Sequence, residues 1–245
     1  MIILSSIDWH THPYGHGKEV SCHNLTTLRS FVEEARNKNL DGIGFTDHEI
    51  FLSDFNFSNL YQLKEEEKLD IKIGIEFDYV PGKEKDINEI LEKFPLEYCI
   101  GSVHDIGNWA FDNSKYKYKF YRLKYKELIN LYKKYFSLLH SAVKSGLFDI
   151  IGHFDLIKIF DFIIKDRRII LDMVNPILDI MKQKSISLEI NTNGLNKPVN
   201  EVYPASDIIK QAKYKNVSIV FSSDAHTSKR VGENFDLIKR FYNLI

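Results

Sequence analysis

Seven continuous apolar runs alternate with amphipathic stretches along this chain of 245 residues. Runs rich in Ile, Val and Phe, without polar alternation, are typical of parallel strands that are covered on both faces. We expect strands over about 2–8, 42–47, 71–79, 98–104, 149–154, 186–192 and 217–224. Helical patterns occupy about 24–39, 57–69, 85–94, 116–144, 168–184, 204–215 and 232–244.

This alternation predicts an α/β fold in which right-handed crossovers join parallel strands. Seven units fit a closed or nearly closed barrel better than an open sheet. No linker, repeat or low-complexity block interrupts the pattern, so we expect a single domain over 1–245. In barrels of this kind the active site lies at the carboxyl ends of the strands.

Residues with metal-binding side chains stand at the ends of the apolar runs. They include seven of the nine histidines, with one Glu and one Asp: His10, His12, His16, His48, Glu76, His104, His153, Asp224 and His226. Imidazole and carboxylate are ligands that zinc, iron and manganese accept. A barrel brings all of these strand ends to one rim, whereas an open sheet would keep the outermost ones apart. The pattern therefore predicts a multi-metal site and favours hydrolysis.

Local spacing supports this interpretation. His10 and His12, and likewise Asp224 and His226, are two residues apart, which aims both members of a pair at one face of a strand. Glu76 lies in an otherwise apolar run, and a buried carboxylate needs a charged partner. That partner would be a cation or, alternatively, a neighbouring Lys.

Composition excludes several classes of protein. Hydrophobic residues make up 44% and charged residues 27% of the chain, and the net charge is −1, so we expect neither nucleic acid nor an anionic membrane as a partner. No apolar stretch reaches the ~18 residues of a membrane span, and the start MIILSSIDWH does not resemble a signal peptide. The two cysteines, Cys22 and Cys99, suggest a reducing compartment, and we expect a cytoplasmic protein with Cys99 buried.

The run SKYKYKFYRLKYKELINLYKKY (114–135) is rich in Lys and Tyr and could offer a basic, aromatic surface to nucleic acid. The alternative is an amphipathic helix with a solvated Lys face and an aromatic core face. We favour the helix, because apolar residues recur near the helical period: Phe120, Leu123, Leu128, Leu131, Tyr135, Leu139 and Val143.

Taken in order, HTH, TDH, the isolated Glu76, GSVH, GHFD and SDAH resemble the PHP (polymerase and histidinol phosphatase) superfamily over nearly the whole chain. The segments YCIGSVHDIGNWAFD, GHFDLIK, LEINTNGLNKPVNEVYP and SSDAHTSKRVG are similar in particular to its stand-alone histidinol-phosphatase branch. The resemblance implies a distorted seven-stranded, TIM-like (β/α)7 barrel that holds two or three divalent metal ions.

The resemblance also implies how the ligands are shared. The first metal would be held by His10, His12, Glu76 and Asp224. The second would be held by the bridging Glu76 with His104 and His153. The third would be held by His48, His226 and a further N-terminal histidine. The loop after His12 is shorter than is usual in the family, and we assign this last ligand to His16, with His23 as the alternative.

The phosphate-binding residues depart from the family pattern. Where the histidinol-phosphatase branch usually has Arg in a GLRKP-like segment, this chain has Asn196 followed by Lys197. A lysine cannot grip phosphate in the bidentate way that arginine does. The other cationic candidates for substrate binding are Lys158, after GHFD, and Arg230, after SDAH.

These features predict a metal-dependent phosphomonoesterase acting on a small phosphorylated metabolite. We expect it to convert L-histidinol phosphate to L-histidinol, in histidine biosynthesis, through a metal-bridging hydroxide. Asp47, His48 or His226 would assist the leaving alkoxide, although Asp47 could instead orient an imidazole. The alternatives are a PHP phosphoesterase acting on a nucleotide, a phosphotyrosine or a nucleic-acid end, and a non-catalytic regulatory module with a structural metal site.

Overall fold

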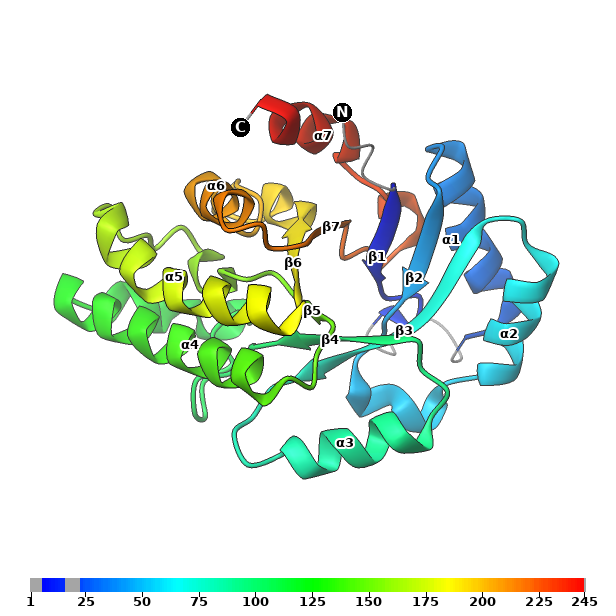
Figure 1. Cartoon of the computed structure of the whole chain (residues 1–245), viewed down its shortest axis with the longest axis horizontal. Coiled ribbons are helices and arrows are strands. Elements are labelled where there is room, and N and C mark those ends of the chain that lie inside the picture. Colours follow the sequence, from blue (N-terminus) through cyan, green and yellow to red (C-terminus); the bar gives the residue numbers. More distant parts are fainter. Residues whose placement is uncertain (1–5, 16–22, 245) are drawn as a thin grey trace.

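The computed structural model of the protein describes residues 6–15 and 23–244. The strands are all parallel and form a closed barrel in chain order, because β1 pairs with both β2 and β7 (Figure 1). Their bounds are β1 Ile7–Thr11, β2 Gly42–Phe45, β3 Asp70–Asp78, β4 Tyr98–Ser102, β5 Ile150–Ile151, β6 Ser187–Asn191 and β7 Ile219–Ser222. The predicted seven-stranded α/β barrel is confirmed.

Helices pack around the outside of the barrel and bury one apolar stripe each. In the first helix, for example, the buried Leu28, Phe31, Val32 and Ala35 recur at helical spacing. The helices are α1 Leu25–Asn37, α2 Phe57–Glu66, α3 Glu84–Lys93, α4 Tyr125–Ser145, α5 Arg167–Lys184, α6 Ser206–Tyr214 and α7 Phe235–Leu244. Within the part of the chain that the structure describes, no helix is long and apolar enough to cross a bilayer.

Short 3-10 segments shape the loops between these elements. Their bounds are η2 Glu49–Asp54, η3 Ser114–Arg122, η4 Leu156–Lys158, η5 Thr192–Asn196 and η6 Ser228–Arg230. Four of them, η2, η4, η5 and η6, follow closely on a strand, so they border the carboxyl end of the barrel.

Two strands differ from their predicted bounds by more than two residues at one end. The first strand, predicted over 2–8, runs to Thr11, and residues 1–5 lie outside the described residues. The fifth, predicted over 149–154, is limited to Ile150–Ile151. It ends early because His153 adopts a φ of 21°, which departs from extended backbone.

The single helix predicted over 116–144 is wrong in its first part. Residues Ser114–Arg122 form the 3-10 helix η3, and α4 begins only at Tyr125. The two are separated by extended backbone at Leu123, and the Lys124 amide donates to the Glu127 carboxylate at 2.7 Å as α4 begins. The break lets Phe120 turn inward, where it stacks on Phe162 with 5.2 Å between ring centroids.

An apolar group fills the barrel interior near the amino ends of β4 and β5, and we call it the floor cluster. It consists of Trp9, Tyr98, Ile100, Ile150 and Val220. The Tyr98 ring fits because two neighbours lack side chains: a Cβ would lie 1.9 Å from its hydroxyl oxygen at Gly44, and 2.7 Å from its ring at Gly74. The hydroxyl donates to the Trp9 carbonyl at 2.7 Å, so the polar group of this side chain is satisfied.

An irregularity in β1 lets this strand serve two parts of the interior. Trp9 meets Tyr98 edge-on, with 5.2 Å between centroids, while the next residue, His10, contacts Glu76. Consecutive residues of a regular strand point to opposite faces. The pairing register of β1 with β2 shifts between Asp8 and Thr11, and such a bulge re-aims side chains.

Candidate metal centre

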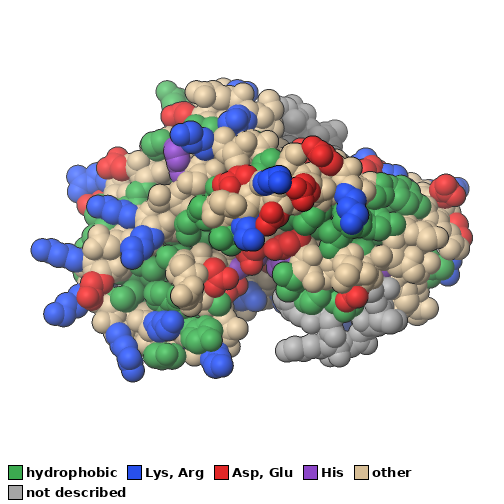
Figure 2. All heavy atoms as spheres, turned by 90° about the horizontal axis from the view of Figure 1, so that it is seen from below, with side chains coloured by type: hydrophobic (Ala, Val, Ile, Leu, Met, Phe, Trp, Pro, Cys, Tyr) green, Lys and Arg blue, Asp and Glu red, His purple; other side chains and the backbone are tan. Residues whose placement is uncertain are grey.

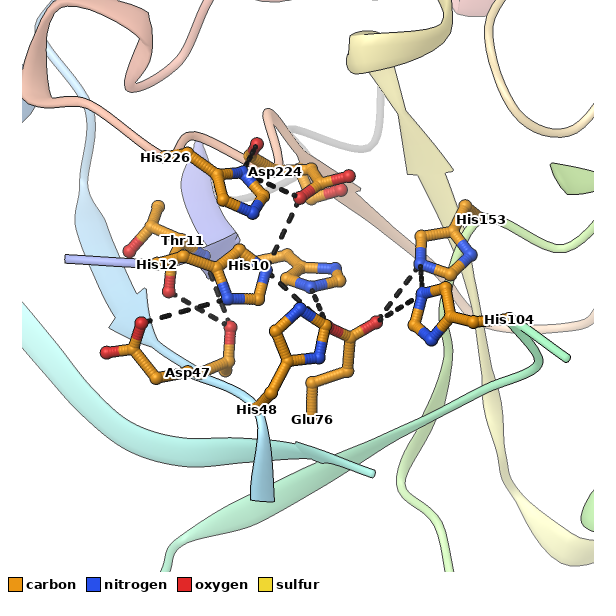
Figure 3. Close-up of polar contacts among 12 residues, drawn as sticks. His10, Thr11, His12, Asp47, His48, Glu76, His104, His153, Asp224 and His226 are labelled. Atoms are coloured by element: carbon orange, nitrogen blue, oxygen red, sulfur yellow. Dashed lines mark hydrogen bonds and ion pairs between the residues drawn. The ribbon is translucent and has the colours of Figure 1, made fainter. Parts of the chain in front are cut away.

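The predicted ligands meet at the carboxyl end of the barrel (Figure 3). We call the group the rim cluster, and it consists of His10, His12, His48, Glu76, His104, His153, Asp224 and His226. A pocket of about 280 Å³ opens beside it. In Figure 2, acidic side chains surround a hollow in the middle of the molecule, and histidine is visible within it. Side chains from distant parts of the sequence therefore converge on one open site.

Glu76 lies at the centre of the rim cluster and is almost fully buried. One oxygen, Oε1, lies 3.0 Å from Nε2 of His153 and 3.6 Å from Nε2 of His104. The same two Nε2 atoms lie 3.3 Å from each other. Lone pairs of two imidazoles and a carboxylate thus point at one small volume, which is the arrangement that a divalent cation satisfies.

The other oxygen of Glu76, Oε2, faces a second set of ligands. It lies 3.3 Å from Nε2 of His10 and 3.5 Å from Nε2 of His12. His12 Nε2 is also 3.3 Å from Oδ1 of Asp224. The buried Nε2 of His10 makes no hydrogen bond to any described residue, so this set also fits a cation.

A third group of imidazoles lies on the open side. The rings of His48 and His226 each lie nearly parallel to the ring of His12, with centroid separations of 4.7 and 4.3 Å. Donor atoms of these three rings lie within 4.8 Å of one another. His48 Nδ1 also lies 3.1 Å from Glu76 Oε2. His16, the assigned third ligand here, lies outside the described residues.

Carboxylates behind the ligands hold their rings in place, and sequence reasoning missed two of them. Glu189, fully buried in β6, accepts at 2.6 Å from Nδ1 of His10 and also from the backbone N–H of His153. Asp78, at the end of β3, contacts Nδ1 of His104. Carboxylates bonded to the second ring nitrogen orient metal-ligating histidines and raise their basicity.

Asp47 lies beside His12 but beyond hydrogen-bond distance of its ring. Its Oδ1 lies 3.8 Å from Nδ1 of His12 and accepts from the Tyr14 amide at 3.0 Å. Its Oδ2 is held at 2.7 Å by Nε2 of His23, whose Nδ1 accepts from the Asn56 amide at 3.3 Å. Both ring nitrogens of His23 are therefore engaged away from the ligands, which argues against His23 as the third ligand.

The comparisons with known proteins agree with this geometry. A family model described as the PHP domain matches residues 10–193, which is most of the chain. The chain belongs to the PHP family. The PHP domain is 35% identical to the "Probable histidinol-phosphatase" of Deinococcus radiodurans, with 89% of this chain and 87% of that protein covered. It is 27% identical to the histidinol-phosphatase of Bacillus subtilis, with 86% and 91% covered.

Among solved structures, the PHP domain resembles a histidinol phosphate phosphatase from Lactococcus lactis, which was crystallised with zinc, L-histidinol and phosphate. The TM-score is 0.76 and the sequence identity is 23%, with 98% of this chain and 93% of that chain covered. At this identity the likeness establishes the shared barrel fold.

Charges within the PHP domain favour bound cations. Burial alone would raise the pKa of the Glu76 carboxyl, but the charges of His48 and His10 hold it well below its ordinary value. Burial and the neighbouring His226 hold the pKa of His12 well below the ordinary value of imidazole. Ionised carboxylates and neutral imidazoles are the forms that bind metal, and Glu76 and His12 favour these forms. Despite burial, neighbouring carboxylates hold the pKa of His10 and His104 well above the ordinary value of imidazole, so a cation bound there would displace a proton.

Two ligands adopt unusual backbone conformations. Asp224 has a φ of 52° and His153 a φ of 21°, which are uncommon for residues other than glycine. The strained turn at Asp224 leaves Oδ1 facing His12, while Asn193 donates to Oδ2 at 3.0 Å. Strain of this kind clusters at functional sites.

The three predicted substrate-binding residues occupy different places. Only Lys197 lines the pocket. Arg230 donates to Asn193 Oδ1 at 3.0 Å, one step behind the ligand Asp224, and also to Glu233 at 3.0 Å.

Lys158 is buried away from the ligands, and three acceptors surround its ammonium group. They are Asp155 at 3.0 Å, Glu201 at 2.7 Å and the Val202 carbonyl at 2.8 Å. This placement argues against direct contact with substrate. Lys158 instead ties the loop after β5 to the loop that carries Tyr203 into the pocket.

Proposed function

We propose that this PHP domain is a metal-dependent phosphomonoesterase that hydrolyses L-histidinol phosphate to L-histidinol. The observation that carries the proposal is the sharing of Glu76 between two sets of ligands, one on each carboxylate oxygen. Two metal ions a few Å apart suit the displacement of a phosphate ester. The names of the two relatives described above, each matched over most of its length, support histidinol phosphate as the substrate.

In this proposal His10, His12, Glu76 and Asp224 would hold one divalent ion, and Glu76, His104 and His153 would hold a second. A third ion would be held by His48, His226 and His16. The imidazole and carboxylate donors suit zinc, iron or manganese. When bound, the ions supply Lewis acidity, which activates water and neutralises charge on the phosphoryl oxygens.

The chain's own residues bind and orient the ester. Lys197 lines the pocket as a cation and offers its charge to the phosphoryl group. His48 and His226 also line the pocket, where an imidazole that is not ligating the third ion would hold the proton required by the leaving alkoxide. Asp47 is engaged with His23 and Tyr14 and lies beside His12, so we assign it an orienting role.

Replacement of Glu76 by Ala tests the proposal. It removes the carboxylate from both ligand sets, so we expect loss of bound metal and a fall in kcat of at least about 10³-fold with histidinol phosphate. Elemental analysis and phosphate release measure the two effects. Glu65→Ala, on the exposed face of α2, is the matched control and should change neither.

Unchanged turnover in Glu76→Ala would refute the metal-dependent mechanism. If wild-type protein carried metal but released phosphate faster from a nucleotide or a phosphotyrosyl peptide than from histidinol phosphate, the proposed reaction would stand and the proposed substrate would be wrong. Metal-loaded protein without activity on any phosphomonoester would favour the non-catalytic regulatory module.

A further inference from the structure

One carboxylate in the pocket forms no hydrogen bond or ion pair with the rim cluster. Four acidic residues line the pocket, namely Glu76, Asp78, Asp112 and Asp224. Glu76, Asp78 and Asp224 all contact histidines of the rim cluster. Asp112 makes no hydrogen bond or ion pair with any residue in 6–15 or 23–244, and it is half-buried. Its charge is therefore available to a ligand.

The backbone around Asp112 is fixed on both sides. The amide of the fully buried Phe111 donates to the His104 carbonyl at 3.3 Å, and its ring meets Tyr135 edge-on. The Asn113 amide donates to the Ala110 carbonyl at 3.3 Å, and its side chain accepts from the Lys115 amide as η3 begins. The backbone that carries the Asp112 carboxylate is thus held in place and is tied to the segment that supplies His104.

The surrounding wall suits an organic group with polar atoms. Leu156, Ile159 and Tyr203 line the same pocket and are almost fully buried. The Tyr203 hydroxyl is buried without a hydrogen-bond partner among the described residues. A bound group in this part of the pocket would be covered by apolar side chains and could still form a hydrogen bond.

Different parts of the pocket therefore suit groups of opposite charge. The metal ligands and Lys197 suit the anionic end of a phosphate ester, and Asp112 suits a cationic end. An aliphatic amine has a pKa near that of Lys and is charged at pH 7, whereas an imidazole is mostly neutral there. Of the groups in an imidazole-bearing amino alcohol, the amine is the one that a carboxylate would attract most.

We infer that Asp112 is a specificity-determining residue that pairs with the protonated primary amine of an amino-alcohol phosphate. The inference rests on the proposed phosphatase function and adds how its substrate is selected. An amine paired with Asp112 would hold the ester so that its phosphate faces the rim cluster. Phosphate esters without an amine would reach the metals without this pairing.

Asp112→Asn tests the inference, because it removes the charge and keeps the shape. Three esters are compared: L-histidinol phosphate, 3-(imidazol-4-yl)propyl phosphate, which lacks the amine, and p-nitrophenyl phosphate. We expect kcat/KM to fall about 10–100-fold for histidinol phosphate and less than about 3-fold for the other two, with unchanged metal content. Asp105→Asn is the matched control, since Asp105 is exposed on the same loop and does not line the pocket.

Each other outcome is decisive. An equal fall for all three esters, or no fall for any, would overturn the inference while leaving the phosphatase function in place. If kcat/KM fell for both imidazole esters but not for p-nitrophenyl phosphate, the amine would be ruled out as the partner of Asp112. The imidazole would then be the group that Asp112 binds. If the wild-type protein hydrolysed none of the three, the proposed function would fail and the inference with it.

Discussion

The two ends of the barrel interior are built on opposite principles. In the floor cluster, Tyr98 packs against Trp9 over two glycines, and its hydroxyl is satisfied by a backbone carbonyl. In the rim cluster, imidazoles and carboxylates crowd around Glu76, and their exposure ranges from the fully buried His10 to the partly exposed His226. The floor lowers the free energy of folding through apolar burial and close packing. The rim concentrates titratable groups whose burial is costly without cations.

This contrast shows how one strand can serve stability and function at once. In β3, Gly74 makes room for the floor, and Glu76, two residues later on the same face, forms the centre of the rim. In β1, the bulge lets Trp9 join the floor and His10 join the rim. Substitutions at the floor should therefore change stability, and substitutions at the rim should change metal binding.

The largest effect on stability is expected at Gly44. A methyl group there would lie 1.9 Å from the Tyr98 hydroxyl oxygen and 3.1 Å from its Cζ. Gly44→Ala should lower the free energy of unfolding by roughly 3 kcal/mol, measured by urea denaturation. Because the closest clash is with the hydroxyl, adding Tyr98→Phe should recover part of the loss. If zinc affinity fell together with stability, the separation of floor and rim would be disproved.

A smaller effect, on metal affinity rather than on the stability of the fold, is expected at Glu189. Glu189→Gln removes the charge behind His10 and should weaken metal binding about 10–100-fold, as measured by competition with a chelator. Ser222→Ala is the matched control, since it deletes only the 2.6 Å hydroxyl contact to the same carboxylate and should have less effect. Equal metal affinity of Glu189→Gln and wild type would contradict the orienting role.

A separate prediction, on labelling rate, concerns Cys99, which lies on the outer face of β4 between the floor residues Tyr98 and Ile100. Burial and the nearby Asp149 raise the pKa of the Cys99 thiol to about 12. With Cys22 replaced by Ser, thiol reagents at pH 8.5 should react with the folded protein about 10³-fold more slowly than with a free cysteine. Rapid labelling before unfolding would show that the layer between barrel and helices is open to solvent.

The fold was predictable because its signal is repeated. Continuous apolar runs and helical stripes alternate along the chain, and each unit supports the same barrel. The helix over 116–144 was mispredicted because Phe120 and Leu123 fit its apolar stripe. Helical periodicity does not reveal that Phe120 packs against Phe162, a tertiary contact that competes with local pattern.

In the candidate site, the residues grouped by their position at strand ends do converge, but their supporting carboxylates were missed. Glu189 lies in SLEIN, an acidic residue within an apolar strand, which is the signal that identified Glu76 in IGIEF. Asp78 follows Glu76 at the spacing that linked His10 to His12. Both signals were present in the sequence. That Lys158 is enclosed by acceptors depends on the loop carrying Glu201, which no local pattern reveals.

The pairing of β1 with β7, which closes the barrel, has a consequence for the order of folding and metal binding. His12 and Asp224 follow closely on the first and last strands, and they face each other where β1 pairs with β7. During synthesis, the residues of the second ligand set, which lie from β3 to β5, are all present in the nascent chain well before the first set is completed by Asp224. Full metal loading must therefore await the closing strand, and a polypeptide interrupted before β7 would hold an incomplete centre.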